Sequence, residues 1–304
     1  MKIDFLTIST MEVWHYQSIV RALCARGVDA RCISPGLDLH SNQIGWDDPW
    51  RIDKLLRTLK LPYWKSRRHD AQCVITTQNY GFVQDYPCKK GRMMYGVGLV
   101  RPKEQMVDER PMDFHLVHGP LGVKQQFSDH ALYSPSLPPE KVAVIGYPKL
   151  DGYWSLEQTR QDRITILYMP TWGERSSIEE HALKLVQKYR KDWLIIKPHH
   201  CTIQHEYQRM ELLQSFRRGT GMVDLCLDDV PIEGLYRQAD HVLTDVSSGA
   251  FPEALLIGKA LEPLGDRSEL VVENLDPKFL FSTTKGQDGE VAAEAILEFI
   301  CSTQ

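Results

Sequence analysis

The sequence lacks three features that each mark a large class of proteins. It has no apolar run close to the roughly 20 residues of a membrane-spanning helix. Its first apolar stretch, Ile3–Ile8, is not followed by the small-residue cleavage site of a signal peptide. Its 36 basic and 40 acidic residues give a formal net charge of −4, which is not the signature of a nucleic-acid-binding protein. We therefore expect a cytoplasmic protein without a nucleic-acid partner, whose contact with the inner face of the membrane is at most peripheral.

Paired cysteines and basic surface motifs are also scarce. The seven cysteines include no Cys-x-x-Cys, and their odd number indicates reduced thiols without a Cys-ligated zinc site. The basic run Lys65–Arg68 is interpreted as a solvated loop. Without a recognisable basic amphipathic helix, the sequence argues against strong membrane docking. We expect neither a metal ion nor a resident cofactor.

Short apolar runs alternate with helical patterns through most of the 304 residues. Strands are expected at 3–8, 29–35, 73–77, 92–97, 114–117 and 142–145, and a second series follows at 164–168, 193–196, 222–226, 241–243 and 260–264. Such alternation predicts an α/β fold with two doubly wound, Rossmann-type parallel-sheet domains, 1–148 and 149–304, that face a cleft. No Gly-x-Gly-x-x-Gly follows the first strand, so a dinucleotide site of that type is not supported.

Polar residues follow several of these strands, where a doubly wound fold places its ligand contacts. Thr171 and Trp172 follow one strand and form either a loop that touches a nucleotide or a plain turn. Lys197 and His199 follow the next strand, where a cation and an imidazole could meet a phosphate. A metal site built on His199, His200 and His205 lacks carboxylate partners, and we do not favour it.

The segment Ala239–Glu253 carries a strand that ends at Asp245 and is followed by a predicted helix. Ser247, Ser248 and Gly249 stand at the start of that helix, where backbone amides can bind an anion, and Ser247 alone could be only an N-cap. Glu253 could reach a ribose diol, or could simply complement the helix dipole. A fourth segment, Val144–Asp151, lies at the expected domain junction.

Taken in order, four segments resemble the CDP-glycerol glycerophosphotransferases of teichoic-acid and capsule synthesis, which have the GT-B fold. The resemblance covers about residues 140–265. It is carried by Gly146-Tyr147-Pro148-Lys149-Leu150-Asp151, Met169-Pro170-Thr171-Trp172, Lys197-Pro198-His199 and Ala239–Ser248. The wider GT-B superfamily, which includes the UDP-N-acetylglucosamine 2-epimerases, shares a Thr-Asp-Ser followed by a helix and Glu.

The resemblance implies a transferase that moves a polyol phosphate, or a glycosyl group, from a nucleotide-diphosphate donor to a hydroxyl of a cell-envelope glycopolymer. An acceptor hydroxyl would attack the β-phosphorus of a CDP-linked donor, and CMP would leave. His199 would assist the leaving phosphate, and the donor would be bound by Thr171, Trp172, Lys197, His199, Asp245, Ser247, Ser248, Gly249 and Glu253.

The base that activates the acceptor is a histidine in the family. Two places compete for it here: His118-Gly119-Pro120, which we favour, and Tyr95-Gly96, where the histidine would be replaced. Two alternatives to the transferase stay open. One is a nucleotide-sugar glycosyltransferase or an enzyme like UDP-N-acetylglucosamine 2-epimerase. The other is a protein that binds a nucleotide or glycan without turnover.

Overall fold

A computed structural model describes residues 1–34, 47–66, 68–78, 81–99, 111–126, 137–157, 162–219, 222–228, 230–270 and 275–302. The chain folds into two compact units. Unit 1 contains the described residues of 1–97, 103–155 and 278–302, and unit 2 contains those of 98–102 and 156–277. The predicted domains, 1–148 and 149–304, differ from this division mainly because the C-terminal segment belongs to unit 1.

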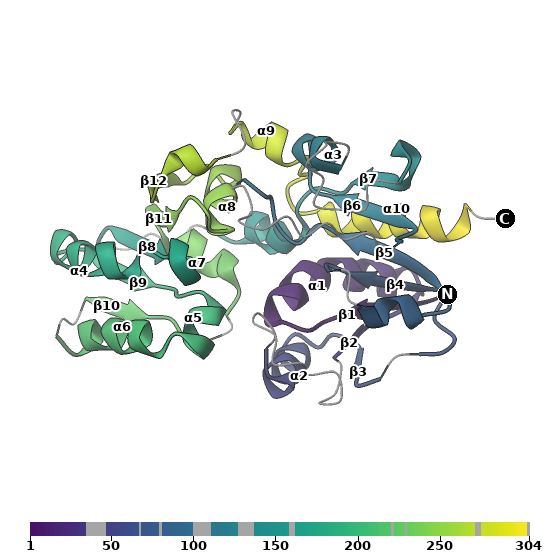
Figure 1. Cartoon of the computed structure of the whole chain (residues 1–304), viewed down its shortest axis with the longest axis horizontal. Coiled ribbons are helices and arrows are strands. Elements are labelled where there is room, and N and C mark those ends of the chain that lie inside the picture. Colours follow the sequence, from purple (N-terminus) through teal and green to yellow (C-terminus); the bar gives the residue numbers. More distant parts are fainter. Residues whose placement is uncertain are drawn as a thin grey trace. The chain divides into compact units, whose positions relative to one another are not determined.

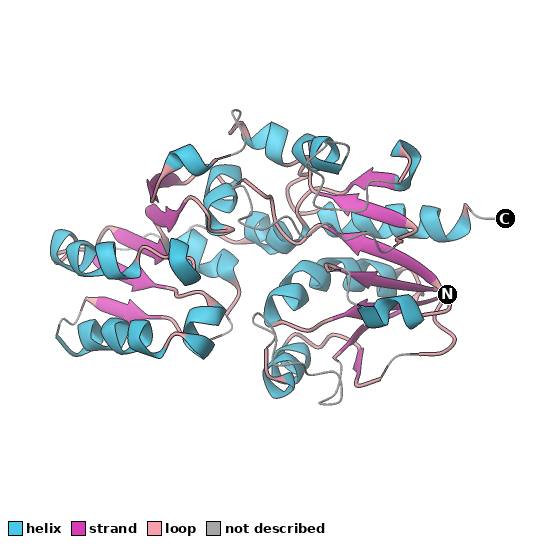
Figure 2. Cartoon of the chain, viewed as in Figure 1, coloured by secondary structure: helices cyan, strands magenta, loops and turns pink. Residues whose placement is uncertain are grey.

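Unit 1 is built on a seven-stranded parallel sheet with the order β3-β2-β1-β4-β5-β6-β7. Strands β4 and β6 are buried along their whole length, as expected for a parallel sheet covered on both faces. Figures 1 and 2 show the sheet and the helices beside it. The elements are β1 Lys2–Leu6, α1 Thr10–Ala25, β2 Asp29–Ile33, α2 Pro49–Thr58, β3 Tyr63–Trp64, β4 Cys73–Thr76, β5 Lys89–Met93, β6 Phe114–Val117, α3 Pro120–Gln126, β7 Val142–Val144, α9 Pro277–Leu280 and α10 Asp288–Cys301.

Unit 2 is built on a five-stranded parallel sheet with the order β10-β9-β8-β11-β12. Side chains of α4 and α6 pack with residues of β8, β9, β10 and β11 in one hydrophobic core. The elements are β8 Thr165–Met169, α4 Ile178–Lys188, β9 Trp193–Ile196, α5 His200–His205, α6 Tyr207–Gly219, β10 Val223–Leu225, α7 Ile232–Gln238, β11 His241–Asp245, α8 Ala250–Leu256 and β12 Ala260–Leu264.

The structure confirms the predicted fold class, two doubly wound parallel α/β sheets. The structure differs from the predicted elements in three places. The strand expected at 92–97 lies at Lys89–Met93, where Lys89 reaches the carbonyls of Phe299 and Ile300 at the end of α10. The helix expected at 206–216 is α6, Tyr207–Gly219, and neither the short helix α5 before it nor the short strand β3 was predicted.

Sheet order sets where ligands can bind. Along the chain the order reverses between β1 and β4 in unit 1, and between β8 and β11 in unit 2. Ligands of doubly wound folds bind outside the carboxyl ends of the strands at such reversals. None of the helices in the described part of the chain has the length and apolar character needed to cross a bilayer.

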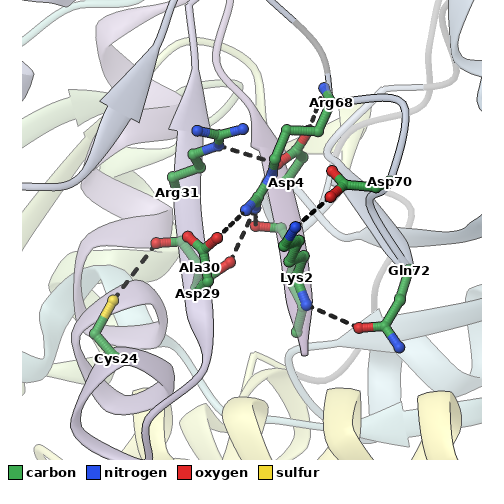
Figure 3. A network of polar contacts seen from close by, with 10 residues as sticks. Lys2, Asp4, Cys24, Asp29, Ala30, Arg31, Arg68, Asp70 and Gln72 are labelled. Carbon is green, nitrogen blue, oxygen red and sulfur yellow. Dashed lines mark hydrogen bonds and ion pairs between the residues drawn. The ribbon is translucent and has the colours of Figure 1, made fainter.

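Near the amino ends of β1 and β2, a buried arginine joins these two strands. Arg68 donates from Nε to Asp4, 2.7 Å away, and from Nη2 to the carbonyls of Ile3 and Asp29, both 2.9 Å away. Figure 3 shows Arg68 together with Asp4 and Asp29. Arg68 is 8% exposed and Asp4 is fully buried. The interpretation of Lys65–Arg68 as a solvated loop is therefore wrong at Arg68, because a charge-assisted network outweighs its hydration.

Candidate functional site

The loop after β8 lies at the strand-order reversal of unit 2. The carboxylate of Asp245, the last residue of β11, accepts the amide of Thr171 at 2.7 Å and that of Ser177 at 3.3 Å. Thr244 donates to the carbonyl of Met169 at 2.7 Å. Asp245 is buried, and burial raises the pKa of its carboxyl. In this structure the predicted donor ligand Asp245 supports the loop that carries Thr171 and Trp172.

The far side of the same loop is held by α5 and α6. Glu206 accepts the amide of Gly173 at 2.8 Å, and Arg209 donates to the carbonyl of Gly173 at 2.8 Å. Glu206 and Arg209 also pair with each other at 2.5 Å. Trp172 thus stands between two anchored positions. Neither Glu206 nor Arg209 was expected from the sequence, since each looks like an ordinary helix-surface charge.

Trp172 and the predicted residue His199 come together. Their rings stack with centroids 6.0 Å apart, and the ring of His199 is tilted against that of His200 with centroids 4.2 Å apart. Nδ1 of His199 accepts the amide of Cys201 at 3.2 Å, which makes His199 the N-cap of α5. Its Nε2 therefore carries the proton when the ring is neutral, so that this nitrogen can donate to an anion. Lys197, two residues earlier, is half-buried.

The same segment offers three metal-ligand atoms. One ligand atom from each of His199, His200 and Cys201 lies within 4.8 Å of the others. His205, which the sequence also suggested, is outside this group.

The residues predicted to bind an anion lie in the turn after β11. The hydroxyl oxygen of Ser248 accepts the amide of Ala250 at 3.2 Å, and the Ser248 amide donates to the carbonyl of Asp245 at 2.9 Å. Helix α8 begins at Ala250, with Gly249 as its N-cap, three residues later than expected. Ser247 is therefore not the N-cap. The Ser248 hydroxyl uses one lone pair of its oxygen in this bond, and its proton can be donated to an anion.

Glu253 lies in α8 and is 1% exposed. Its carboxylate accepts the hydroxyl of Tyr236 at 2.8 Å. The expected contact with a ribose diol stays a prediction, and it requires this buried carboxylate to be exposed first.

In unit 1 the histidine favoured as base lies directly after β6. Nδ1 of His118 is 2.9 Å from the carbonyl of Gly146, an acceptor, so this nitrogen carries the proton and Nε2 is the basic atom. The His118 ring lies edge-on to Tyr147 at 4.7 Å and parallel to His15 at 6.1 Å. The ring centroids of His15 and Tyr95 are also 5.3 Å apart. His118 and Tyr95, which mark the two positions considered for the base, therefore border the same group of rings around His15.

His15 was missed by sequence reasoning. It lies in α1, six residues after the capping residue Ser9, and is 1% exposed. Burial, followed by the nearby charges of Lys149 and His118, lowers its pKa well below the usual value. The sequence offered one signal, the position of His15 soon after the first strand. Many histidines with a purely structural role occupy such a position.

The segment Gly146–Asp151 attaches the C-terminal helix to unit 1. Asp288, at the start of α10, accepts the amide of Tyr147 at 2.7 Å, and Asp151 accepts the amides of Asp288 and Gly289 at 3.0 and 2.7 Å. Gly146 has φ +72°, and a Cβ there would lie 2.4 Å from the Asp288 carboxyl carbon. This glycine is thus required by both conformation and close approach.

Comparison with known proteins shows similarity at the level of the fold. No family model matches the sequence, and no curated protein matches it. Among solved structures, the chain is similar to the UDP-GlcNAc 2-epimerase of Methanocaldococcus jannaschii in complex with UDP-GlcNAc and UDP (TM-score 0.63, 14% identity, 98% of this chain and 99% of that one).

Two further solved structures are similar over most of the chain. The putative UDP-N-acetylglucosamine 2-epimerase of Listeria monocytogenes has a TM-score of 0.62 at 13% identity, covering 100% of this chain and 97% of that one. The wall teichoic acid polymerase TagF has a TM-score of 0.60 at 11% identity, covering 99% and 89%. At these identities the comparisons establish the architecture, which is that of GT-B enzymes.

Proposed function

We propose that this protein is a GT-B enzyme that transfers a polyol phosphate, or a glycosyl group, from a nucleotide-diphosphate donor to a hydroxyl of a cell-envelope glycopolymer. The observation that carries the proposal is the doubly anchored loop at the strand-order reversal of unit 2. Asp245 holds one side of Trp172, and Glu206 with Arg209 holds the other. A loop fixed in this way presents a pre-organised surface to a ligand.

Donor binding is assigned to unit 2. The hydroxyls of Ser247 and Ser248, with the backbone at Gly249, would donate to the diphosphate. Lys197 and the Nε2 proton of His199 would offset the charge that develops on the leaving phosphate. Trp172, half-buried and stacked on His199, offers an aromatic surface beside these donors.

Proton abstraction is assigned to unit 1. The hydrogen bond to Gly146 leaves the lone pair of His118 on Nε2, the arrangement of a general base. Nε2 would take the proton of the acceptor hydroxyl as its oxygen forms a bond to the β-phosphorus. The bond between that phosphorus and the bridging oxygen then breaks, and the nucleoside monophosphate leaves with the electron pair. A CDP-linked donor is favoured by the motifs that resemble the glycerophosphotransferases.

A second candidate is an enzyme like UDP-N-acetylglucosamine 2-epimerase. It is favoured by the structural neighbours, since the Methanocaldococcus jannaschii protein was solved with UDP-GlcNAc and UDP. The donor nucleotide distinguishes the two candidates, because the first expects cytidine and the second expects uridine.

Calorimetric titration of CDP, CMP, UDP, GDP, CDP-glycerol and UDP-GlcNAc into the full chain tests the donor site. We expect cytidine nucleotides to bind and Ser248→Ala to weaken binding about tenfold, the effect of one lost hydrogen bond to a charged group. Ser215→Ala is the matched control, because Ser215 is an exposed helix serine of the same unit. Binding of UDP alone would favour the epimerase, and no binding to any nucleotide would refute the assignment.

Turnover is tested separately by release of CMP from CDP-glycerol with polyol-phosphate acceptors. His118→Asn should abolish release while CDP affinity stays near wild type. Nucleotide binding without any product, in wild type as well, would instead support a binding protein without turnover.

A further inference from the structure

One peptide group in unit 1 joins the proposed base to a buried carboxylate. The carbonyl of Gly146 lies 2.9 Å from Nδ1 of His118. The amide of the next residue, Tyr147, donates to Asp288 at 2.7 Å. This carbonyl and this amide belong to the same peptide bond, and in a trans peptide they point in opposite directions. A continuous chain of hydrogen bonds therefore runs from an imidazole, through a peptide, to a carboxylate.

The Asp288 carboxylate is held firmly in this place, and its residue is 1% exposed. Its Oδ2 accepts the Tyr147 amide and the hydroxyl of Thr283, the latter at 2.6 Å. Its Oδ1 accepts the amide and the hydroxyl of Thr284, both at 2.6 Å. Four accepted hydrogen bonds match the acceptor capacity of an ionised carboxylate. The group is therefore fixed against the peptide, and a Cβ on Gly146 would lie 2.4 Å from its carboxyl carbon.

Attachment of helix α10 does not account for this arrangement. Asp288 is the first residue of α10, but its carboxylate binds residues before the helix and the distant Tyr147. The first amides of α10, those of Asp288 and Gly289, are accepted by Asp151 at 3.0 and 2.7 Å. One carboxylate thus attaches the helix, and the other is directed at the peptide that His118 contacts.

The segment before α10 also holds the main chain of the proposed base. The amide of Ser282 donates to the carbonyl of His118 at 2.9 Å. The Phe281 ring lies edge-on to Tyr147 with centroids 4.9 Å apart, and His118 is fully buried. Both the main chain and the ring of His118 are therefore fixed by residues of the C-terminal segment.

We propose that Asp288 is a positioning residue for His118 and acts through the Gly146–Tyr147 peptide. A hydrogen bond to a charged acceptor is stronger than one to a neutral group, and hydrogen bonds in a chain polarise one another. The carboxylate polarises the N–H of Tyr147 and makes the carbonyl of Gly146 a better acceptor for the Nδ1 proton. This fixes the ring and keeps the lone pair on Nε2. The role rests on the proposed function, in which His118 is the base.

Nitrogen NMR of the full chain with ¹⁵N-labelled histidine measures the tautomer directly, at about pH 8, where imidazoles are neutral. His118→Asn removes the His118 signals and so assigns them. In wild type we expect a protonated Nδ1 and an unprotonated Nε2. Asp288→Asn keeps the size of the side chain and an oxygen that can accept the Tyr147 amide, but removes the charge. We expect the His118 proton in this variant to be shared between Nδ1 and Nε2.

Asp151→Asn is the matched control, because it neutralises the carboxylate that binds the first amides of α10. It should leave the His118 tautomer as in wild type. A wild-type ring protonated on Nε2, an unchanged ring in Asp288→Asn, or an equal change in the control would overturn the proposal.

Gly146→Ala provides a second variant should Asp288→Asn fail to fold. It keeps the charge of Asp288 but forces the carboxylate from its place, so the His118 tautomer should change here too. Gly27→Ala, at a glycine of positive φ with open space at its Cβ position among the described residues, should leave the tautomer unchanged. An unchanged ring in Gly146→Ala would also overturn the proposal.

Turnover tests the two proposals separately. In Asp288→Asn, kcat for CMP release should fall about tenfold, the loss expected when a charged acceptor becomes neutral, and KM for the donor should stay near wild type. The tautomer is measured without substrate, so it decides the role of Asp288 even if no donor is turned over. A changed tautomer together with wild-type release in His118→Asn would refute the base and leave the effect of Asp288 on the ring standing.

Discussion

Glu12 in the first turn of α1 provides a direct test of how burial acts on ionisation in this protein. The side chain is 1% exposed. One carboxylate oxygen accepts the amides of Ile8 and Ser9 at 2.6 and 3.1 Å, and the other accepts the hydroxyl of Thr77 at 2.5 Å. Desolvation outweighs these hydrogen bonds and raises the pKa of Glu12 from 4.5 to about 7.

The direction of the pH effect follows from this shift. Since the folded protein binds this proton more tightly than the unfolded chain, protonation of Glu12 favours the folded state. The stabilising contribution is fully present below about pH 4.5 and is lost as the pH rises through about 7. A rise of this size corresponds to roughly 3 kcal/mol. For a unit of 150–250 residues, that is a change in melting temperature of roughly 6–12 °C.

Glu12→Gln isolates this contribution. The amide oxygen of glutamine can accept the two backbone amides, and its NH₂ group can donate to the Thr77 hydroxyl, so the hydrogen bonds are kept without a charge. We expect wild type and variant to have similar stability at pH 5, and the variant to be more stable by roughly 3 kcal/mol at pH 8.

Differential scanning calorimetry from pH 5 to pH 8.5 at constant ionic strength measures this difference. Other groups whose pKa is raised by burial, such as Asp151 with a pKa of about 6, are present in both proteins and cancel in the comparison. If the melting temperatures of the two proteins differed by the same amount at every pH in this range, the argument that burial governs the ionisation of Glu12 would be refuted. A variant that is less stable at every pH would instead show that the carboxylate itself is required.

Two further predictions concern the packing of unit 1. Gly146→Ala should destabilise the protein by about 1–3 kcal/mol more than Gly27→Ala in chemical denaturation, since both glycines have positive φ but only Gly146 faces a carboxylate at 2.4 Å. An equal loss of stability in the two variants would show that the Asp288 side chain moves aside without an energetic cost. Arg68→Met should cost about 3–5 kcal/mol, because it removes the hydrogen-bonded partner of the buried Asp4 carboxylate and leaves only Arg31, 3.7 Å away. Lys188→Met, which breaks an ion pair exposed by about half, should cost less than about 1 kcal/mol, and similar losses for the two would contradict the role given to Arg68.

Local pattern was enough to place most of the strands. Phe114–Val117, Trp193–Ile196 and Ala260–Leu264 have the predicted bounds. A short apolar run between polar turns is a property of neighbouring residues, and a parallel strand buried on both faces shows it in full. The same reasoning placed Thr171 and Ser248 after their strands, and both therefore lie at the carboxyl ends that the sheet order selects.

Contacts between distant residues decided the rest. The amide of Thr171 is bound by a carboxylate 74 residues away, Arg68 is buried because Asp4 lies 64 residues before it, and α10 joins unit 1 through a bond between Tyr147 and Asp288, 141 residues apart. Such pairs leave no periodic pattern in the sequence, because each residue alone looks like an ordinary surface charge or turn residue. The sequence by itself thus determined the elements and the places where polar groups end them. Only the tertiary structure decided which of those groups support a loop, which are buried, and which remain exposed to bind a partner.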